Sequence, residues 1–171
     1  MKLILTGHDY AGKSTVLTNI WDTVDTGKMS YLHLSYREPT NREFYNHTLE
    51  YSNFLMDRCF LDELIYPRVF GREQNITEQD AAELLKDAYD RGITIAVIYC
   101  SEEEIRNRIA KRTNIEEEPE VLEHILLIRN LYIHYANLFG IPLIDSTGKT
   151  PDEVKEEVLA LIPKKEARKL I

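Results

Sequence analysis

A short segment near the start of the chain has the residue types and spacing of a loop that binds polyphosphates. Residues 7–14 read GHDYAGKS, which satisfies the pattern G-x-x-x-x-G-K-[ST] in full. Glycines let backbone N–H groups turn inward around phosphate oxygens, and a helix starting after Gly12 would add its N-terminal dipole. In such a loop Lys13 contacts the β- and γ-phosphates, and the Ser14 hydroxyl is a ligand for Mg²⁺. The pattern predicts a nucleoside triphosphate site made by Gly7, Ala11, Gly12, Lys13, Ser14 and Thr15.

Other charged residues could complete a phosphoryl-transfer site. Asp57 ends the apolar run NFLM, and ligands gather where parallel strands end, so this carboxylate could hold Mg²⁺ or orient an acceptor. Arg108 and Arg112 are one helical turn apart and share a helix face, from which they could close over phosphates and stabilise transferred charge. We therefore predict a metal site at Ser14 and Asp57. The predicted catalytic residues are Lys13, Asp57, Arg108 and Arg112.

The elements that must position these residues alternate between short apolar runs and longer helical patterns. This alternation is typical of an α/β fold with a mostly parallel sheet. The run ITIAVIY is continuous and β-branched, as a central parallel strand should be. Residues 119–138 repeat apolar side chains at helical spacing, and a helix is predicted from Gly12 to near Asp25. Thr77, Ser101 and Thr150 are each followed three residues later by an acidic residue, which predicts helix starts. We expect about six helices and five strands, at residues 2–6, 29–36, 53–56, 93–99 and 142–144.

Composition limits the class of protein. The 171 residues suit one domain, and 29 acidic against 21 basic residues give a net charge of −8, which argues against a protein that mainly binds duplex phosphates. No apolar run approaches the length of a membrane span, and Cys59 and Cys100 lack metal-ligand spacing, which favours reduced thiols. We expect a soluble, intracellular, cytoplasmic protein without a membrane partner. No N/T-K-x-D element for guanine occurs, which argues against a GTPase switch.

Several further motifs follow the loop in a distinctive order. REPT stands at 37–40, DR at 57–58, arginines at 106, 108 and 112, and RNLY at 129–132. Together with the loop GHDYAGKST, these segments resemble the motifs of thymidylate kinases, which belong to the P-loop kinases. The resemblance implies one kinase domain over residues 1–171 with the loop on the central strand of a five-stranded parallel sheet. It also implies an arginine-bearing lid at about 106–119. Separately, the basic composition of the last residues predicts a tail at about 163–171. Tyr10 stands where some family members carry an arginine, so the lid should supply that charge and reach ATP after closing.

The resemblance implies roles for the substrate-binding residues. Asp9 would accept a hydrogen bond from the 3′-hydroxyl of the sugar. Arg37 and Arg58 would bind the acceptor phosphate through their forked donors, with Glu38 beside them. The segment from Asp57 to Tyr66 also looks like that of small phage and deoxynucleoside kinases. Tyr66, with Phe60 and Phe70, could stack on a base or belong to the core.

The implied activity is ATP- and Mg²⁺-dependent transfer of a phosphoryl group to a small nucleotide. The implied acceptor is a pyrimidine deoxynucleoside monophosphate. The enzyme could be a homodimer. Only residues 41–52 fill the gap where the family builds its base pocket, so base contacts do not carry over. Two alternatives stay open. One is a kinase of a hydroxyl, on a nucleoside or on a hydroxymethylpyrimidine in DNA. The other is a non-catalytic ATP-binding regulatory module.

Overall fold

The computed structural model describes residues 1–23, 29–34, 41–113 and 119–163. The strands are β1 (Lys2–Thr6), β2 (Ser30–His33), β3 (Phe54–Asp57), β4 (Thr94–Tyr99) and β5 (Leu143–Asp145). They form one parallel sheet in the order β2-β3-β1-β4-β5, so β1 lies at the centre. This confirms the predicted α/β fold with a five-stranded parallel sheet.

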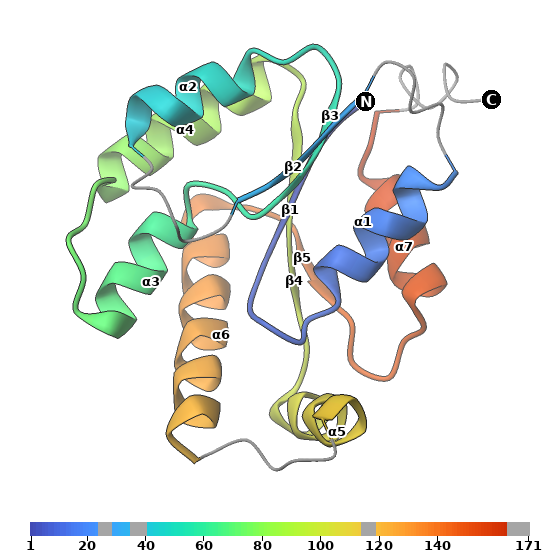
Figure 1. The fold of residues 1–171 in the computed structure, drawn as a ribbon. Helices are drawn as coiled ribbons and strands as arrows, with labels where there is room; N and C mark the ends of the chain where they lie inside the picture. Colours follow the sequence, from blue (N-terminus) through green and yellow to red (C-terminus); the bar gives the residue numbers. More distant parts are fainter. Residues whose placement is uncertain (24–28, 35–40, 114–118, 164–171) are drawn as a thin grey trace.

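The helices cover both faces of the sheet and one of its ends. In the described residues they are α1 (Lys13–Trp21), α2 (Arg42–Leu49), α3 (Asp62–Phe70), α4 (Glu78–Asp90), α5 (Glu102–Thr113), α6 (Pro119–Phe139) and α7 (Pro151–Ala160). Helices α1 and α7 lie together on one side of the sheet, and α2, α3, α4 and α6 lie on the other (Figure 1). Helix α5 lies below the end of β4 (Figure 1), which brings it close to the loop that follows β1.

The core consists of two layers because the side chains of a strand alternate between the faces of a sheet. Leu3 and Leu5 are fully buried in the cluster beneath α1 and α7. Ile4, between them, belongs to the larger cluster on the opposite face, where Tyr132 and Tyr135 of α6 are buried. The central strand is therefore fixed from both sides, and so is the position at which the loop begins.

Element boundaries differ most from the sequence-based expectation at α1 and β2, while those of β3, β4 and β5 differ by one residue. Helix α1 ends at Trp21, short of Asp25, because the backbone N–H and the hydroxyl of Thr23 both donate to the Ile20 carbonyl and tighten the last turn. Strand β2 is shorter than residues 29–36, and residues 35–36 and Asp25 itself lie outside the described part. The predicted helix starts are confirmed, with capping boxes at Thr77 and Thr150 and a Ser101 hydroxyl that accepts from the Glu104 N–H.

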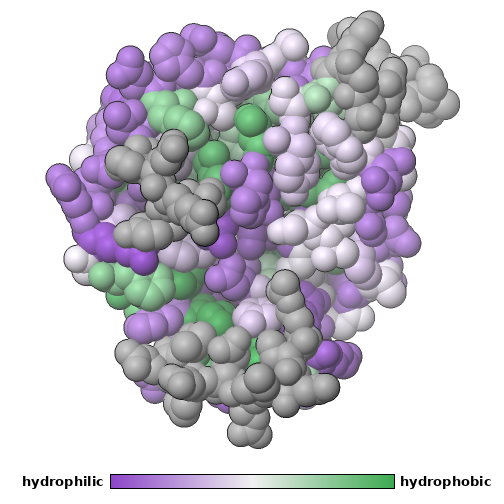
Figure 2. All heavy atoms as spheres, viewed as in Figure 1, coloured by the Kyte–Doolittle hydropathy of each residue, from purple (hydrophilic) through white to green (hydrophobic). Residues whose placement is uncertain are grey.

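One face of the molecule is mainly polar. Hydrophilic residues dominate the face shown in Figure 2, where hydrophobic residues occupy scattered areas. In the part of the chain that the structure describes, no helix has the length and apolar character needed to cross a membrane. Cys59 and Cys100 are buried free thiols.

Candidate active site

Residues 7–14, which we call the phosphate loop, connect β1 to α1 and require glycine at both ends. Gly7 has φ +142°, and a Cβ there would lie 2.0 Å from the carbonyl oxygen of Ile98 in β4. Gly12 has φ +94° and is the N-cap of α1. Among the described residues, no side chain caps this helix. Its first amides therefore point at the space inside the loop, an arrangement suited to binding an anion.

Lys13 is held inside the loop rather than extended into solvent. Its side chain is buried, and its Nζ donates to the carbonyl oxygen of His8 at 2.9 Å. Burial lowers the pKa of this ammonium group, and the nearby carboxylates of Asp57 and Asp9 oppose that shift. The charge is thus placed where polyphosphate oxygens would replace much of the water that the lysine lost.

His8 is a structural residue of the loop that sequence reasoning missed. Its Nε2 accepts from the backbone N–H of Cys100 at 3.1 Å, so Nδ1 carries the proton and donates to the Asp9 carbonyl oxygen at 2.6 Å. Burial lowers the pKa of this imidazole to about 4, although the bond to Asp9 opposes the shift. A neutral His8 therefore ties the loop to the end of β4. Sequence spacing carries no signal for this contact, since Cys100 is remote in the chain.

The predicted metal-binding pair is brought together at the ends of β3 and α1. The Ser14 hydroxyl donates to Oδ2 of Asp57 at 2.6 Å, and Nδ1 of His33 lies 3.2 Å from the same oxygen. Oδ1 of Asp57 is buried without a hydrogen-bond partner in the described residues. A hydroxyl and a carboxylate oxygen without a partner are hard oxygen donors of the kind that suit Mg²⁺. The described residues contain no cluster of three His, Cys, Asp or Glu side chains that could hold a metal alone, so phosphates and water would complete the coordination.

Arg58 lies beside the loop and is tightly paired. Its backbone has φ +78°, and its guanidinium donates to Asp9 at 3.0 Å and lies 3.5 Å from a carboxylate oxygen of Asp62. Burial would lower the pKa of this guanidinium, but Asp62, Tyr66, Tyr132 and Asp9 raise it above its ordinary value. The DR motif thus places Asp57 and Arg58 together at the mouth of the loop.

A buried polar network supports Arg58 from behind. Asp62 accepts from the hydroxyls of Tyr132 at 2.6 Å and Thr6 at 3.0 Å. Burial raises the pKa of the Asp62 carboxyl, while Arg58 and the two hydroxyls oppose that rise. Tyr132, predicted from the RNLY motif, therefore contributes to the support of Arg58 and not to the surface of the site.

Tyr66 lies beneath the Arg58 guanidinium, whose central carbon is 5.1 Å from the centre of the ring. The ring stacks on Phe70, and Phe60 is buried in the core. Among the described residues Tyr66 is not part of the cleft wall, so its predicted base stacking has no support from this geometry. It contacts Arg58 instead.

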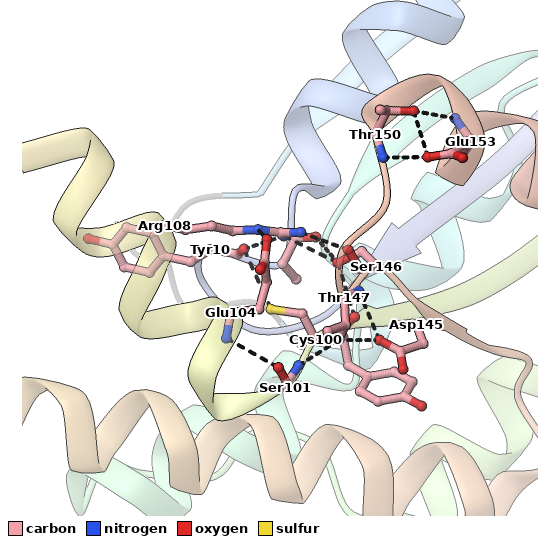
Figure 3. Close-up of polar contacts among 12 residues, drawn as sticks. Tyr10, Cys100, Ser101, Glu104, Arg108, Asp145, Ser146, Thr147, Thr150 and Glu153 are labelled. Carbon is pink, nitrogen blue, oxygen red and sulfur yellow. Dashed lines mark hydrogen bonds and ion pairs between the residues drawn. The ribbon is translucent and has the colours of Figure 1, made fainter.

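Arg108 connects helix α5 to the phosphate loop (Figure 3). Its Nη1 donates to the Tyr10 carbonyl oxygen at 2.8 Å and to Ser146 Oγ at 3.2 Å, and Nη2 donates to the Ser146 carbonyl oxygen at 2.8 Å. Its Nε donates to Glu104 at 2.7 Å, which fixes the guanidinium on the helix. We expected Arg108 to reach the ATP site only after the lid closes. In this structure Arg108 already contacts the phosphate loop.

Tyr10 is a non-glycine residue with a positive φ in the phosphate loop. Its φ is +66°, a conformation that costs roughly 1–2 kcal/mol for an L-residue. Its ring packs against the cluster of Cys100, Ile105, Ile109 and Ile125 between α5 and α6. Packing and the Arg108 bond together hold the strained residue in place.

The remaining residues that the sequence motifs singled out either bond to partners outside the phosphate loop or fall outside the described residues. Arg106 is exposed and paired with Glu102 one turn away. Arg129 donates from Nε to the Cys100 carbonyl oxygen at 2.5 Å. Arg37 and Glu38 lie outside the described residues, as do the side chain of Arg112, the lid segment 114–118 and the tail from 164 onward.

One cleft of about 800 Å³ is lined by residues 9–14 of the phosphate loop together with Asp57, Arg58 and Arg108. Its β2–β3 end is lined by Asp9, His33, Asp57 and Arg58. Its β5–α7 end, across the phosphate loop, is lined by residues of α5 and α7 and of the loop between β5 and α7, among them Arg108, Lys111, Ser146, Lys149, Pro151 and Val154. The loop therefore lies between two parts of one cleft, with space for a ligand on each side.

Comparison with known proteins identifies the fold. No family model and no curated protein matches the sequence. The YorR protein of Bacillus subtilis, solved with phosphorylated GDP, is 20% identical with a TM-score of 0.78, over 97% of this chain and 98% of that chain. Thymidylate kinase from Candida albicans is 16% identical with a TM-score of 0.61, over 99% of this chain and 94% of that one. Deoxyadenosine kinase from M. mycoides with bound dATP is 16% identical with a TM-score of 0.54, over 94% and 98%. The chain has the fold of the P-loop nucleotide and nucleoside kinases.

Proposed function

We propose that this protein is a P-loop kinase that transfers the γ-phosphoryl group of ATP to a pyrimidine deoxynucleoside monophosphate. The observation that carries the proposal is the arrangement of one cleft around the phosphate loop. Lys13 and Ser14 lie at its centre, and Asp57 lies at its β2–β3 end together with the paired Asp9 and Arg58. An in-line transfer needs this order of donor, metal and acceptor groups.

The donor would bind with its phosphates in the loop. The amides at the start of α1 and the Lys13 ammonium would hold the β- and γ-phosphates, and the nucleoside would extend toward the β5–α7 end. Glycine is favoured at position 12 by its φ of +94°, since a Cβ there would make only an ordinary van der Waals contact with Arg108 at 3.6 Å. Arg108 maintains the loop shape through Tyr10 and adds positive charge at the donor side.

Mg²⁺ bound at Ser14 and Asp57 would neutralise charge on the β- and γ-phosphates. Ser14 can fill this role while keeping its bond to Asp57, because the hydroxyl donates its hydrogen bond to the carboxylate and its oxygen lone pairs stay free. The orphaned Oδ1 of Asp57 can accept from water on the ion.

The acceptor would bind at the β2–β3 end. Arg58 offers a guanidinium whose orientation is fixed by Asp9, Asp62 and the Tyr66 ring, and Arg37 would join it from outside the described part. A phosphate between these arginines would be held by charge-assisted hydrogen bonds and pointed at the γ-phosphate. Asp9, being half-exposed, can also receive a sugar hydroxyl.

A second candidate function is phosphorylation of a hydroxyl, on a nucleoside or a hydroxymethylpyrimidine in DNA. It is favoured by the short stretch of chain between β2 and β3, whose described residues include the eight-residue helix α2 and which leaves less chain to enclose a small base. The net charge of −8 weighs against DNA as the acceptor.

A panel assay tests the proposal. ATP carrying a radioactive γ-phosphate is incubated with each deoxynucleoside monophosphate, each deoxynucleoside and hydroxymethyluracil-containing DNA. We expect label on a pyrimidine monophosphate, lost with Lys13→Ala and retained with Lys86→Ala, whose lysine is exposed and paired with Asp90. Label on a hydroxyl acceptor alone would favour the second candidate, and ATP binding without any labelled product would favour a regulatory module.

A further inference from the structure

The two oxygens of the Asp57 carboxylate have different surroundings. Oδ2 accepts from Ser14 Oγ at 2.6 Å and lies 3.2 Å from Nδ1 of His33. Oδ1 is buried and has no hydrogen-bond partner among the described residues. An ionised carboxylate only accepts hydrogen bonds, so the imidazole must donate from Nδ1.

His33 is placed for this bond by the sheet itself. It is the last residue of β2 and stands opposite Asp57 in the parallel register, and the N–H of Leu34 donates to the Asp57 carbonyl oxygen at 3.1 Å. Its side chain is 53% exposed and lines the cleft, so it contributes little to the core. A side chain that is so exposed, yet bonded to a buried carboxylate, points to a role in the site.

The bond has a geometric consequence. With Ser14 as the only donor, the carboxylate could swivel about its Cβ–Cγ bond and still keep one hydrogen bond. Two donors on Oδ2, one from α1 and one from β2, fix the plane of the group and with it the direction of Oδ1. The Ser14 hydroxyl donates its hydrogen bond to the carboxylate, which leaves the serine lone pairs free.

We propose that His33 is a positioning residue of the metal site, which fixes the Asp57 carboxylate so that Oδ1 and the lone pairs of Ser14 face a metal-bound nucleotide. The inference rests on the proposed function, because it assigns His33 to the Mg²⁺–ATP site. His33 does not touch the reacting atoms in this role. It acts through Asp57, as partners of metal-binding carboxylates commonly do.

The test compares three kinds of variant. His33→Leu removes the donor, and His33→Ala removes it without adding bulk. His33→Asn keeps an N–H donor at the same distance from the backbone as Nδ1. His47→Leu is a matched control, because His47 is an exposed histidine on α2 that does not line the cleft.

Mn²⁺ is titrated into each protein with a non-hydrolysable ATP analogue and followed by electron paramagnetic resonance, and analogue binding is measured separately in EDTA. We expect His33→Leu and His33→Ala to weaken Mn²⁺ binding about tenfold or more, while His33→Asn and His47→Leu stay within about threefold of the wild type. Binding without metal should not change. The inference is overturned by unchanged Mn²⁺ affinity in His33→Leu and His33→Ala, by a His33→Asn loss equal to theirs, or by an equal loss in EDTA. If the wild type itself binds no metal with the analogue, the proposed function fails first, and the inference fails with it.

Discussion

Nη1 of Arg108 lies 2.8 Å from the backbone carbonyl oxygen of Tyr10, and this bond joins helix α5 to the phosphate loop. The same guanidinium is bonded to Ser146, which donates in turn to the Ala11 carbonyl oxygen at 2.9 Å (Figure 3). Helix α5 and the segment after β5, which are remote from the phosphate loop in sequence, therefore both bond to it, at the consecutive carbonyl oxygens of Tyr10 and Ala11. The first half of α5 is bonded to the loop through Arg108.

Arg108→Ala should weaken ATP binding and slow turnover together, because the loop loses its tether and Tyr10 loses the bond that offsets its positive φ. We expect a loss of at least tenfold in kcat/KM, about 1.4 kcal/mol. Steady-state kinetics and calorimetric titration of an ATP analogue measure both effects. Arg106→Ala on the same helix should leave them unchanged, since Arg106 is exposed and bonded only to Glu102 in the described contacts. A fall in kcat with unchanged ATP affinity would instead assign Arg108 to the transition state alone.

Arg58→Ala should raise the KM of a monophosphate acceptor far more than that of ATP, because a charge-assisted contact contributes roughly 1.5–3 kcal/mol. The change also leaves the buried Asp62 without its cation, so the protein should lose stability. Adding Asp62→Asn should restore stability but not acceptor KM, which separates the two effects. Arg68→Ala, at an exposed arginine paired with Glu78, is the control. If the KM values of acceptor and ATP change alike in Arg58→Ala, the hydroxyl acceptor becomes the better assignment.

His8 should make stability fall in mild acid. Burial lowers its pKa from 6.5 to about 4, so between these values the unfolded chain binds a proton that the folded chain excludes. The contribution is fully present above pH 6.5 and is lost as the pH falls toward 4, by up to about 3 kcal/mol. Urea unfolding of the wild type and His8→Gln from pH 7 to pH 4.5 measures it. The variant should show a flatter profile, whereas the exposed His134→Gln should follow the wild type. Parallel profiles for the wild type and His8→Gln would refute the neutral, buried role of His8.

Gly7→Ala should be severely destabilising, because the added Cβ would lie 2.0 Å from the Ile98 carbonyl oxygen and neither strand can move aside. We expect a loss of roughly 3 kcal/mol or more from overpacking and backbone strain combined. Gly148→Ala also has positive φ, at +67°, but open space around it, so it should cost only about 1–2 kcal/mol. Chemical denaturation compares the two. Similar losses would mean that φ alone, and not the contact with β4, requires glycine at position 7.

The features that the sequence predicted are those that depend on residues close together in the chain. The phosphate loop, the DR pair at the end of β3 and the capping boxes at Thr77 and Thr150 each depend on local spacing, and the structure contains all of them. The strand pattern also predicted the parallel sheet, because continuous apolar runs separated by helices have few other ways to bury both faces. What could not be predicted were partners that meet only after folding, such as His8 with Cys100 and Arg108 with Tyr10.

Asp57 shows where this division falls. Its position at the end of an apolar strand is evident from the sequence, which also predicts a metal site shared with Ser14. That His33 shares its carboxylate, and that one oxygen is left without a partner in the described residues, follows only from the register of β2 against β3. Local spacing determines which residues a loop or helix presents, because backbone geometry acts over a few residues. The tertiary structure decides which of them face one another, because hydrogen bonds and desolvation act through space and do not depend on distance along the chain.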